Sequence, residues 1–217
     1  MDKLKFDNVY ERGRNFYTLN YSKGSSYGEK LMRIKDQEFR LWDPLRSKLS
    51  AFISKGTDQI GIREGNIVLY LGASSGTTVS HVSDIVRDGF VFALEVSPTM
   101  MRKLYYVCKD RNNLSPILAD ASNPELYKNK ITKVDVIYQD IAQRNQLDIF
   151  FKNSDAFLKQ GGFCILCVKA RSIDVVKKPK EIYKEVMKKL SEKFEIINYK
   201  ELDPFQKDHC MFICKKN

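Results

Sequence analysis

The sequence predicts a doubly wound α/β domain that follows a small antiparallel β-subdomain. Between residues 66 and 193, short apolar runs alternate with amphipathic helical segments, which is typical of a mostly parallel sheet covered by helices. The first 45 or so residues differ, because aromatic and polar side chains alternate there between turn residues, as in hairpins. We therefore expect two domains, residues 1–45 and 46–217, with a ligand site beyond the carboxyl ends of the parallel strands.

Two aromatic–polar runs define the N-terminal subdomain. They span residues 6–10 and 15–21, and Arg12-Gly13-Arg14 forms the expected turn between them. The chain then crosses into the main domain through a segment that carries Asp43 and Pro44. We expect Asp43 to cap a helix and Pro44 to begin it, because each residue type favours that position.

The stretch from Asn66 to Val96 organises the main domain. It predicts a buried strand, a loop bracketed by Gly72 and Gly76, a helix, and a second strand that ends at Glu95. Glycines allow a sharp turn and let a ligand approach where a Cβ atom would intrude. A carboxylate at the end of the second strand can accept hydrogen bonds from both hydroxyls of a ribose. The stretch therefore indicates a nucleotide-binding βαβ unit.

The composition of the glycine loop narrows the class of nucleotide. It reads Gly-Ala-Ser-Ser-Gly-Thr rather than the Gly-x-Gly-x-x-Gly of dinucleotide-binding proteins. No lysine follows the second glycine, which excludes a phosphate-binding P-loop. The looser loop of methyltransferases that use S-adenosyl-L-methionine (SAM) fits, and other nucleotide binders stay open as alternatives.

The rest of the main domain continues the alternation of strands and helices. Further strands are expected at residues 115–118, 134–138, 163–168, 194–202 and 210–214, and further helices at 98–108, 148–158 and 178–193. Polar residues end or follow four of the parallel strands, namely Glu95, Asp120, Asp140 and Lys169. Because these strand ends share one edge of the sheet, we expect the four side chains to gather at the ligand site.

Charge and hydropathy limit the partners and the location. The 217 residues include 37 lysines and arginines against 27 acidic residues, for a net charge of +10. Such a surplus favours a polyanion such as a nucleic acid, and a merely basic, solvated surface is the alternative. No apolar run approaches the roughly 20 residues that span a bilayer, and no signal segment is evident, so we expect a cytoplasmic protein.

Two residue types invite a metal or redox interpretation. Cys164 and Cys167 are three residues apart in an expected strand, so they should point to opposite faces and cannot share a metal ion. We expect the five cysteines to be reduced core residues and predict no metal site. His81, within the helix after the glycine loop, should be a packing or capping group rather than a ligand.

Five segments together resemble the fibrillarin family, the SAM-dependent RNA 2′-O-methyltransferases of box C/D guide ribonucleoproteins. The segments are Ser47-Lys48-Leu49, residues 71–84, residues 140–143, Val168-Lys169-Ala170 and Lys207-Asp208-His209. The resemblance covers nearly the whole chain, and the run Thr-Thr-Val-Ser-His-Val is far more specific than a generic glycine loop. The sequence has no Gly/Arg-rich N-terminal extension, and in this respect it resembles the archaeal form of the family rather than the nucleolar one.

This resemblance implies a SAM-methyltransferase (Rossmann-like) sheet and guide-RNA-directed 2′-O-methylation of ribosomal RNA, with transfer RNA as a further substrate. The implied partners are a Nop-type scaffold protein, a kink-turn-binding protein, the box C/D guide RNA and its target RNA. The location would be cytoplasmic in an archaeal-type cell and nucleolar only in a eukaryotic one. Two alternatives stay open, a protein methyltransferase on the same fold and a mainly structural SAM-binding subunit.

The resemblance also implies a set of cofactor contacts. In chain order these are Gly72, Thr77, Thr78, Glu95, Val96, Asp120, Ala121, Asp140, Ile141, Ala142 and Gln143. The two threonines would contact the methionine end of SAM, and Glu95 with Val96 the ribose. Asp120 and Ala121 would read the adenine edge, and residues 140–143 would line the methyl-donor side.

A charged set resembles the Lys-Asp-Lys-His tetrad of the family, and its members are Lys48, Asp140, Lys169 and His209. A ribose hydroxyl is a poor nucleophile, so the site must align it with the methyl group and help remove one proton. Two lysines near one pocket repel, which should lower the pKa of at least one, while Asp140 can orient an ammonium. We expect Lys169 to accept the proton, with Lys48 and His209 as positioning and electrostatic groups.

Overall fold

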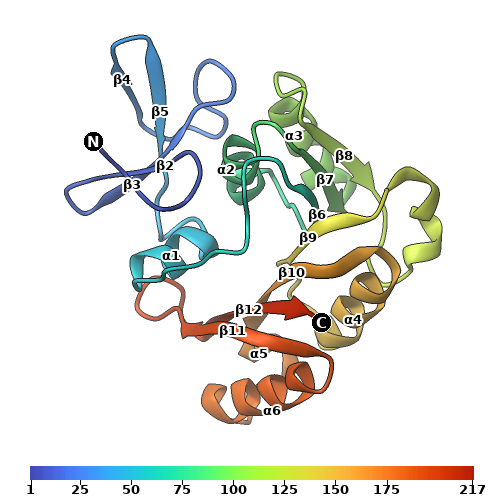
Figure 1. Ribbon diagram of the computed structural model, residues 1–217. Coiled ribbons are helices and arrows are strands. Elements are labelled where there is room, and N and C mark those ends of the chain that lie inside the picture. Colours follow the sequence, from blue (N-terminus) through green and yellow to red (C-terminus); the bar gives the residue numbers. More distant parts are fainter.

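The computed structural model describes residues 1–217 and contains two β-sheets (Figure 1). The N-terminal sheet is antiparallel, with five strands in the order β1-β2-β3-β5-β4. Its strands are Asp2–Lys3 (β1), Val9–Arg12 (β2), Asn15–Leu19 (β3), Leu31–Ile34 (β4) and Gln37–Leu41 (β5). The hairpins expected from the aromatic–polar alternation are confirmed. The division of the chain at residue 45 stays a prediction.

The second sheet has seven strands in the order β11-β12-β10-β9-β6-β7-β8. They are Ile67–Leu71 (β6), Phe90–Glu95 (β7), Leu114–Leu118 (β8), Val134–Gln139 (β9), Leu158–Lys169 (β10), Phe194–Glu201 (β11) and His209–Lys216 (β12). Strands β6 to β10 are parallel, and β11 and β12 add an antiparallel edge. The chain runs outward from β6 to β8 and then returns to β9 on the other side of β6. This reversal creates a switch point between β6 and β9, where ligands bind in such sheets.

Helices cover both faces of this sheet. They are Lys48–Ser54 (α1), Thr77–Ile85 (α2), Pro98–Cys108 (α3), Gln146–Phe157 (α4), Ala170–Ile173 (α5) and Pro179–Ser191 (α6), with two short 3₁₀ turns at Pro124–Leu126 and Lys128–Lys130. Side chains from α1, α2 and α3 share one buried cluster with the N-terminal sheet. Those from α4 and α6 share a second cluster on the opposite face. The predicted α/β fold class is confirmed.

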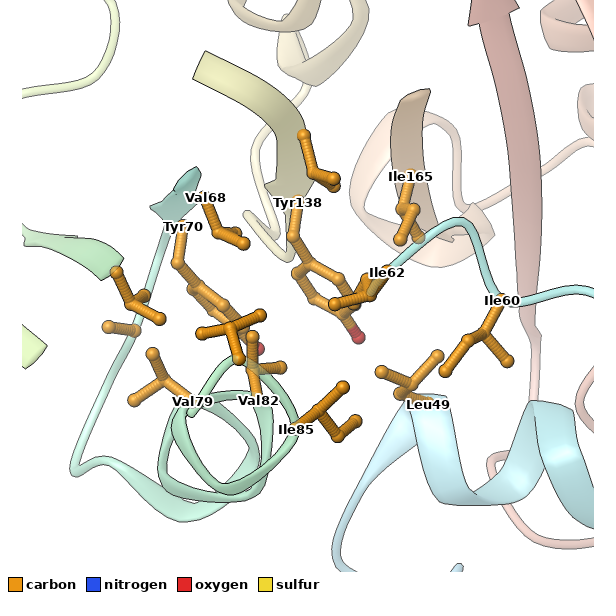
Figure 2. Packing of buried hydrophobic residues seen from close by; sticks show 14 of the residues in the cluster. Leu49, Ile60, Ile62, Val68, Tyr70, Val79, Val82, Ile85, Tyr138 and Ile165 are labelled. Atoms are coloured by element: carbon orange, nitrogen blue, oxygen red, sulfur yellow. The ribbon is translucent and has the colours of Figure 1, made fainter. Parts of the chain in front are cut away.

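The alternation of side chains along the central strands divides the core. Tyr70 and Tyr138 point to the face of α1 and α2, where their rings stack with centroids 4.4 Å apart (Figure 2). Cys164 and Cys167 follow the same rule, because they belong to the two opposite clusters. All five cysteines are buried and unpaired, as expected. No helix in the chain is both long enough and apolar enough to cross a lipid bilayer.

Several expected helix details are wrong. Helix α1 begins at Lys48 and is capped by Ser47, whereas Asp43 only closes a turn by accepting from the backbone N–H of Leu45 at 2.8 Å. The helical periodicity of residues 98–108 predicts Tyr105 on the apolar face of α3, but its ring is exposed and Val107 is buried instead. Packing against the sheet decides these points, because capping and periodicity patterns allow neighbouring registers.

The other corrections concern boundaries. Helix α5 follows Lys169 directly and was not expected. His209 is the first residue of β12 rather than part of the preceding loop, because it pairs with Lys169 across the antiparallel edge. The remaining elements begin and end within a few residues of the prediction, except that β10 extends back to Leu158 through an irregular register.

Candidate active site at the switch point

The glycine loop is shaped by one close backbone contact. Gly72 has φ of +82°, and a Cβ atom there would lie 2.5 Å from the carbonyl oxygen of Asp140. The ends of β6 and β9 can approach this closely only because position 72 has no side chain. Gly76 has φ of +100° and caps α2, so the helix begins at Thr77 and directs its N-terminus toward the loop.

Glu95 connects the glycine loop to the next helix. Its carboxylate accepts hydrogen bonds from the backbone N–H of Ser74 at 2.7 Å and from that of Ser97 at 2.8 Å. Ser74 itself has φ of +50°, an unusual conformation for a residue with a side chain. Glu95 is only 8% exposed, so its carboxylate is held rigidly at the carboxyl end of β7.

Two adjoining cavities open at this edge of the sheet. The first, of about 240 Å³, is lined by Gly72, Ser74, Leu94, Glu95, Val96, Ala119, Asp120, Ala121, Asp140, Ile141, Ala142, Gln143 and Ile149. The second is lined by Arg46, Lys48, Tyr70, Gly72, Ala73, Ser74, Ser75, Thr77, Thr78 and Asp140. Gly72, Ser74 and Asp140 line both, so the cavities meet at the end of β6.

Every residue expected to contact the cofactor lines one of these cavities. The two threonines line the second cavity, and the residues expected around the ribose and adenine line the first. Sequence reasoning missed other lining residues, among them Ser74, Arg46 and Tyr70. Side chains alternate between the two faces along a strand, so the face to which Tyr70 points could have been predicted from the sequence. Ser74 and Arg46 carry no such signal.

The four charged residues of the expected tetrad form two pairs, Lys48 with Asp140 and Lys169 with His209. Lys48 at the start of α1 donates from Nζ to Oδ2 of Asp140 at 2.8 Å. Lys169 and His209 are directly opposed across β10 and β12. The Nδ1 atom of His209 lies 2.6 Å from the carbonyl oxygen of Lys207. A carbonyl can only accept, so Nδ1 carries the proton and Nε2 keeps a free lone pair in the neutral ring.

The pKa shifts in this group have identifiable causes. Burial lowers the pKa of His209, and the charges of Lys48 and Lys169 add to that effect. Burial also disfavours the charged form of Lys48, but the Asp140 carboxylate outweighs it and raises the pKa of that lysine. The expectation that repulsion between the lysines lowers a pKa is therefore wrong for Lys48. Its ion pair with Asp140 dominates.

The chain matches the fibrillarin family model over residues 1–217. It belongs to the fibrillarin family. Its sequence is 47% identical over 216 residues to the fibrillarin-like rRNA/tRNA 2′-O-methyltransferase of Methanocaldococcus jannaschii, covering 96% of this chain and 94% of that protein.

Two solved fibrillarin structures are similar throughout. A structure described as a fibrillarin/Nop5p complex has a TM-score of 0.93 and 42% identity, covering 99% of this chain and 100% of that one. The fibrillarin of Aeropyrum pernix, with natively bound S-adenosyl-L-methionine, has a TM-score of 0.85 and 42% identity over 92% of this chain and 88% of that one.

In this fibrillarin family member, Ser47 connects both halves of the site. Its hydroxyl oxygen accepts from Nε1 of Trp42 at 2.9 Å and forms a 3.1 Å hydrogen bond with Oγ1 of Thr78. It also caps α1, one residue before Lys48. The hydroxyl therefore joins the exit of the N-terminal sheet, the helix that carries Lys48 and the helix that carries Thr78.

His81 is a packing group, as expected. Thr18 donates its hydroxyl proton to Asp84 at 2.6 Å, so Nδ1 of His81 donates to the threonine oxygen at 2.7 Å. Nε2 then accepts from the hydroxyl of Tyr27 at 2.6 Å, and the ring stacks on Trp42. Complete burial lowers the pKa of His81 well below its ordinary value, which keeps it neutral.

A buried ion network surrounds this histidine. Oδ2 of Asp84 accepts from Nη1 of Arg40 at 2.7 Å, and Oδ1 accepts from Nη1 of Arg111 at 2.7 Å. Arg40 comes from β5 and also pairs with Glu29, whereas Asp84 lies on α2. The network therefore fixes the N-terminal sheet against the helix that follows the glycine loop.

Proposed function

We propose that this chain is a SAM-dependent RNA ribose 2′-O-methyltransferase that acts on ribosomal and transfer RNA. The observation that carries the proposal is the junction of the two cavities. One cavity presents the Glu95 carboxylate that suits a ribose, and the other contains the Lys48–Asp140 pair. A methyl group delivered where the cavities meet would lie beside the Lys48–Asp140 pair, whereas Lys169 and His209 line neither cavity. The activity named for the M. jannaschii relative supports the same reaction.

The residues of the cavities fit SAM. Glu95 would accept from the ribose hydroxyls, because each carboxylate oxygen keeps a free acceptor site after its backbone contact. Thr77 and Thr78 begin α2, whose N-terminus favours the carboxylate of the methionine end. Asp120 and Ala121 would read the adenine edge, and residues 140–143 would line the methyl-donor side. Bound SAM supplies an electrophilic methyl group.

The residues of the tetrad would orient the ribose and remove its proton. Asp140 holds the Lys48 ammonium, which can stabilise negative charge on the attacking oxygen. We assign proton acceptance to Lys169, whose backbone directly follows the buried run Cys164 to Val168 of β10 while its side chain is exposed. His209 is the second candidate. Its depressed pKa and free Nε2 lone pair favour it as an acceptor at neutral pH.

Substitution of these two residues tests the assignment. Lys169→Ala should abolish most methyl transfer from labelled SAM to RNA while SAM binding survives. Lys169→Arg should fail too, because guanidinium stays protonated. His209→Gln is the matched comparison, since it removes the titrating lone pair and keeps a side chain of similar size. Near-normal turnover by Lys169→Arg would show that position 169 supplies only charge. Loss in His209→Gln of the acidic limb of the pH–rate profile would move the base to His209.

We further propose that the chain acts inside a box C/D ribonucleoprotein. The similar structure in complex with Nop5p supports a Nop-type scaffold protein as partner. The basic chain contains no recognised sequence-reading module, so the choice of target has to come from other components. We therefore include a guide RNA and a kink-turn-binding protein among the partners. Methyl transfer to a target RNA should need the scaffold and a matching guide. Guide-independent methylation of one RNA sequence, or methylation of a protein instead, would contradict it.

A further inference from the structure

A short segment after Lys169 is attached directly to the turn that carries His209. Helix α5 begins at Ala170, whose backbone N–H donates to the carbonyl oxygen of Asp208 at 3.0 Å. Nε of Arg171 reaches Oδ2 of the same aspartate at 3.2 Å. Residues 171–178, here called the 171–178 loop, therefore begin beside two members of the tetrad.

The 171–178 loop is held in one shape by its own polar groups. Nη1 of Arg171 donates to the carbonyl oxygens of Val175 at 2.8 Å and Lys177 at 3.4 Å. Oδ1 of Asp174 accepts from the backbone N–H groups of Val176 at 2.7 Å and Lys177 at 3.0 Å. These bonds lower the pKa of Asp174, and the nearby charge of Arg144 contributes to the shift.

The loop presents an unusual combination of side chains. Val175 and Val176 are 73% and 87% exposed, which makes them the most exposed large apolar residues of the chain. Between residues 169 and 180 the chain carries five cations and one anion, so the valines are surrounded by positive charge. Lys178 and Lys180 are exposed, and Lys177 is held only by an exposed pair with Glu185. Nothing in the chain covers this surface.

Double-helical RNA has the complementary chemistry. Its minor groove is wide and shallow and displays the 2′-hydroxyls, with phosphates on either side. A duplex that offers one 2′-hydroxyl to the tetrad would place neighbouring riboses and phosphates next to this loop. Apolar side chains can contact the carbon edge of a ribose, while lysines neutralise phosphates.

We propose that the 171–178 loop is a docking surface for the duplex that contains the target nucleotide. Val175 and Val176 contact the ribose edge of the minor groove, and Lys177 and Lys178 contact the flanking phosphates. This inference rests on the proposed RNA methyltransferase function, and it names a surface that determines how the substrate is held.

Two double variants test the proposal in the reconstituted complex with scaffold protein and guide RNA. They are Val175→Ser/Val176→Ser and Lys177→Ala/Lys178→Ala. Each should raise KM for the target RNA about three- to tenfold, with kcat and SAM affinity within about twofold of wild type. The lysine variant should also reduce the slope of log KM against log salt by roughly one to two. The matched control is Lys188→Ala/Lys189→Ala, which removes two exposed lysines from the last turn of α6.

The outcomes separate this inference from the proposed function. If the wild-type complex transfers methyl groups to RNA but both loop variants keep its KM and salt slope, the docking surface alone is overturned. An equal increase in KM in the Lys188/Lys189 control would overturn it too, because net charge would then explain the effect. Loss of scaffold binding with an unchanged KM for RNA would assign the loop to a protein contact instead. A wild-type complex that transfers no methyl group to RNA would contradict the proposed function itself.

Discussion

Replacing Ser47 with alanine should destabilise the fold and loosen the active site together. Ser47 is 2% exposed, and its hydroxyl accepts from the indole N–H of Trp42 at 2.9 Å. Without it, a buried donor has no partner, which costs about 1–3 kcal/mol. The same hydroxyl caps α1, but its distance to the backbone N–H of Ser50 is 3.5 Å, so this loss lies near the low end of about 0.5–2 kcal/mol. The expected decrease in the free energy of unfolding is therefore about 1.5–3.5 kcal/mol.

The assay uses the only tryptophan of the chain. The Trp42 side chain serves as the probe of the urea unfolding midpoint. Its indole N–H also shows directly whether the hydrogen bond to Ser47 is lost. Because Lys48 begins the helix that Ser47 caps, the variant should also lower kcat for methyl transfer. SAM affinity should fall as well, since Thr78 loses its hydroxyl partner.

Two comparisons make the reasoning about Ser47 refutable. Ser54→Ala removes a hydroxyl from the same helix whose only bond is to the backbone carbonyl of Ser50, so stability should change little. Ser47→Thr keeps the hydroxyl and should recover most of the activity. An unfolding free energy for Ser47→Ala within about 0.5 kcal/mol of wild type would refute the assigned hydrogen bonds.

Three further predictions follow from the site and its supports. Glu95→Ala should weaken SAM binding by about 1–3 kcal/mol in calorimetry, because ribose donors lose a buried acceptor. Gly72→Ala should lower both SAM affinity and thermal stability, since the added Cβ atom meets the Asp140 carbonyl 2.5 Å away. Burial opposes ionisation of Asp84, but two buried arginines hold its pKa well below the ordinary value. A depressed pKa stabilises the fold above the unfolded value of about 3.9, so the urea midpoint should fall steeply as pH decreases below about 4. Asp84→Asn should reduce that acid dependence.

Each of these three has a contradicting result. Unchanged SAM affinity in a folded Glu95→Ala variant would remove Glu95 from the ribose site. A Gly72→Ala variant with the melting temperature and SAM affinity of wild type would mean that the ends of β6 and β9 can separate freely. An Asp84→Asn variant with the acid dependence of wild type would assign the pH sensitivity to other carboxylates, such as Glu29.

The sequence by itself determined the nucleotide-binding unit, because its signals are local. The apolar run of β6, the glycines at 72 and 76, and the Ser97-Pro98 start of α3 each restrict the backbone within a few residues. The opposite facing of Cys164 and Cys167 follows from strand geometry alone, and the structure confirms it. Family resemblance then selected the four tetrad positions, which periodicity could not have done.

Only the tertiary structure decided how distant segments support that unit. Ser47 rather than Asp43 caps α1, because the Ser47 hydroxyl also has a partner 31 positions later, in Thr78. The raised pKa of Lys48 comes from a carboxylate 92 positions away. His209 belongs to a strand because Lys169 pairs with it. Local patterns restrict dihedral angles over a few residues, whereas caps, ion pairs and strand ends are settled by groups that only the folded chain brings together.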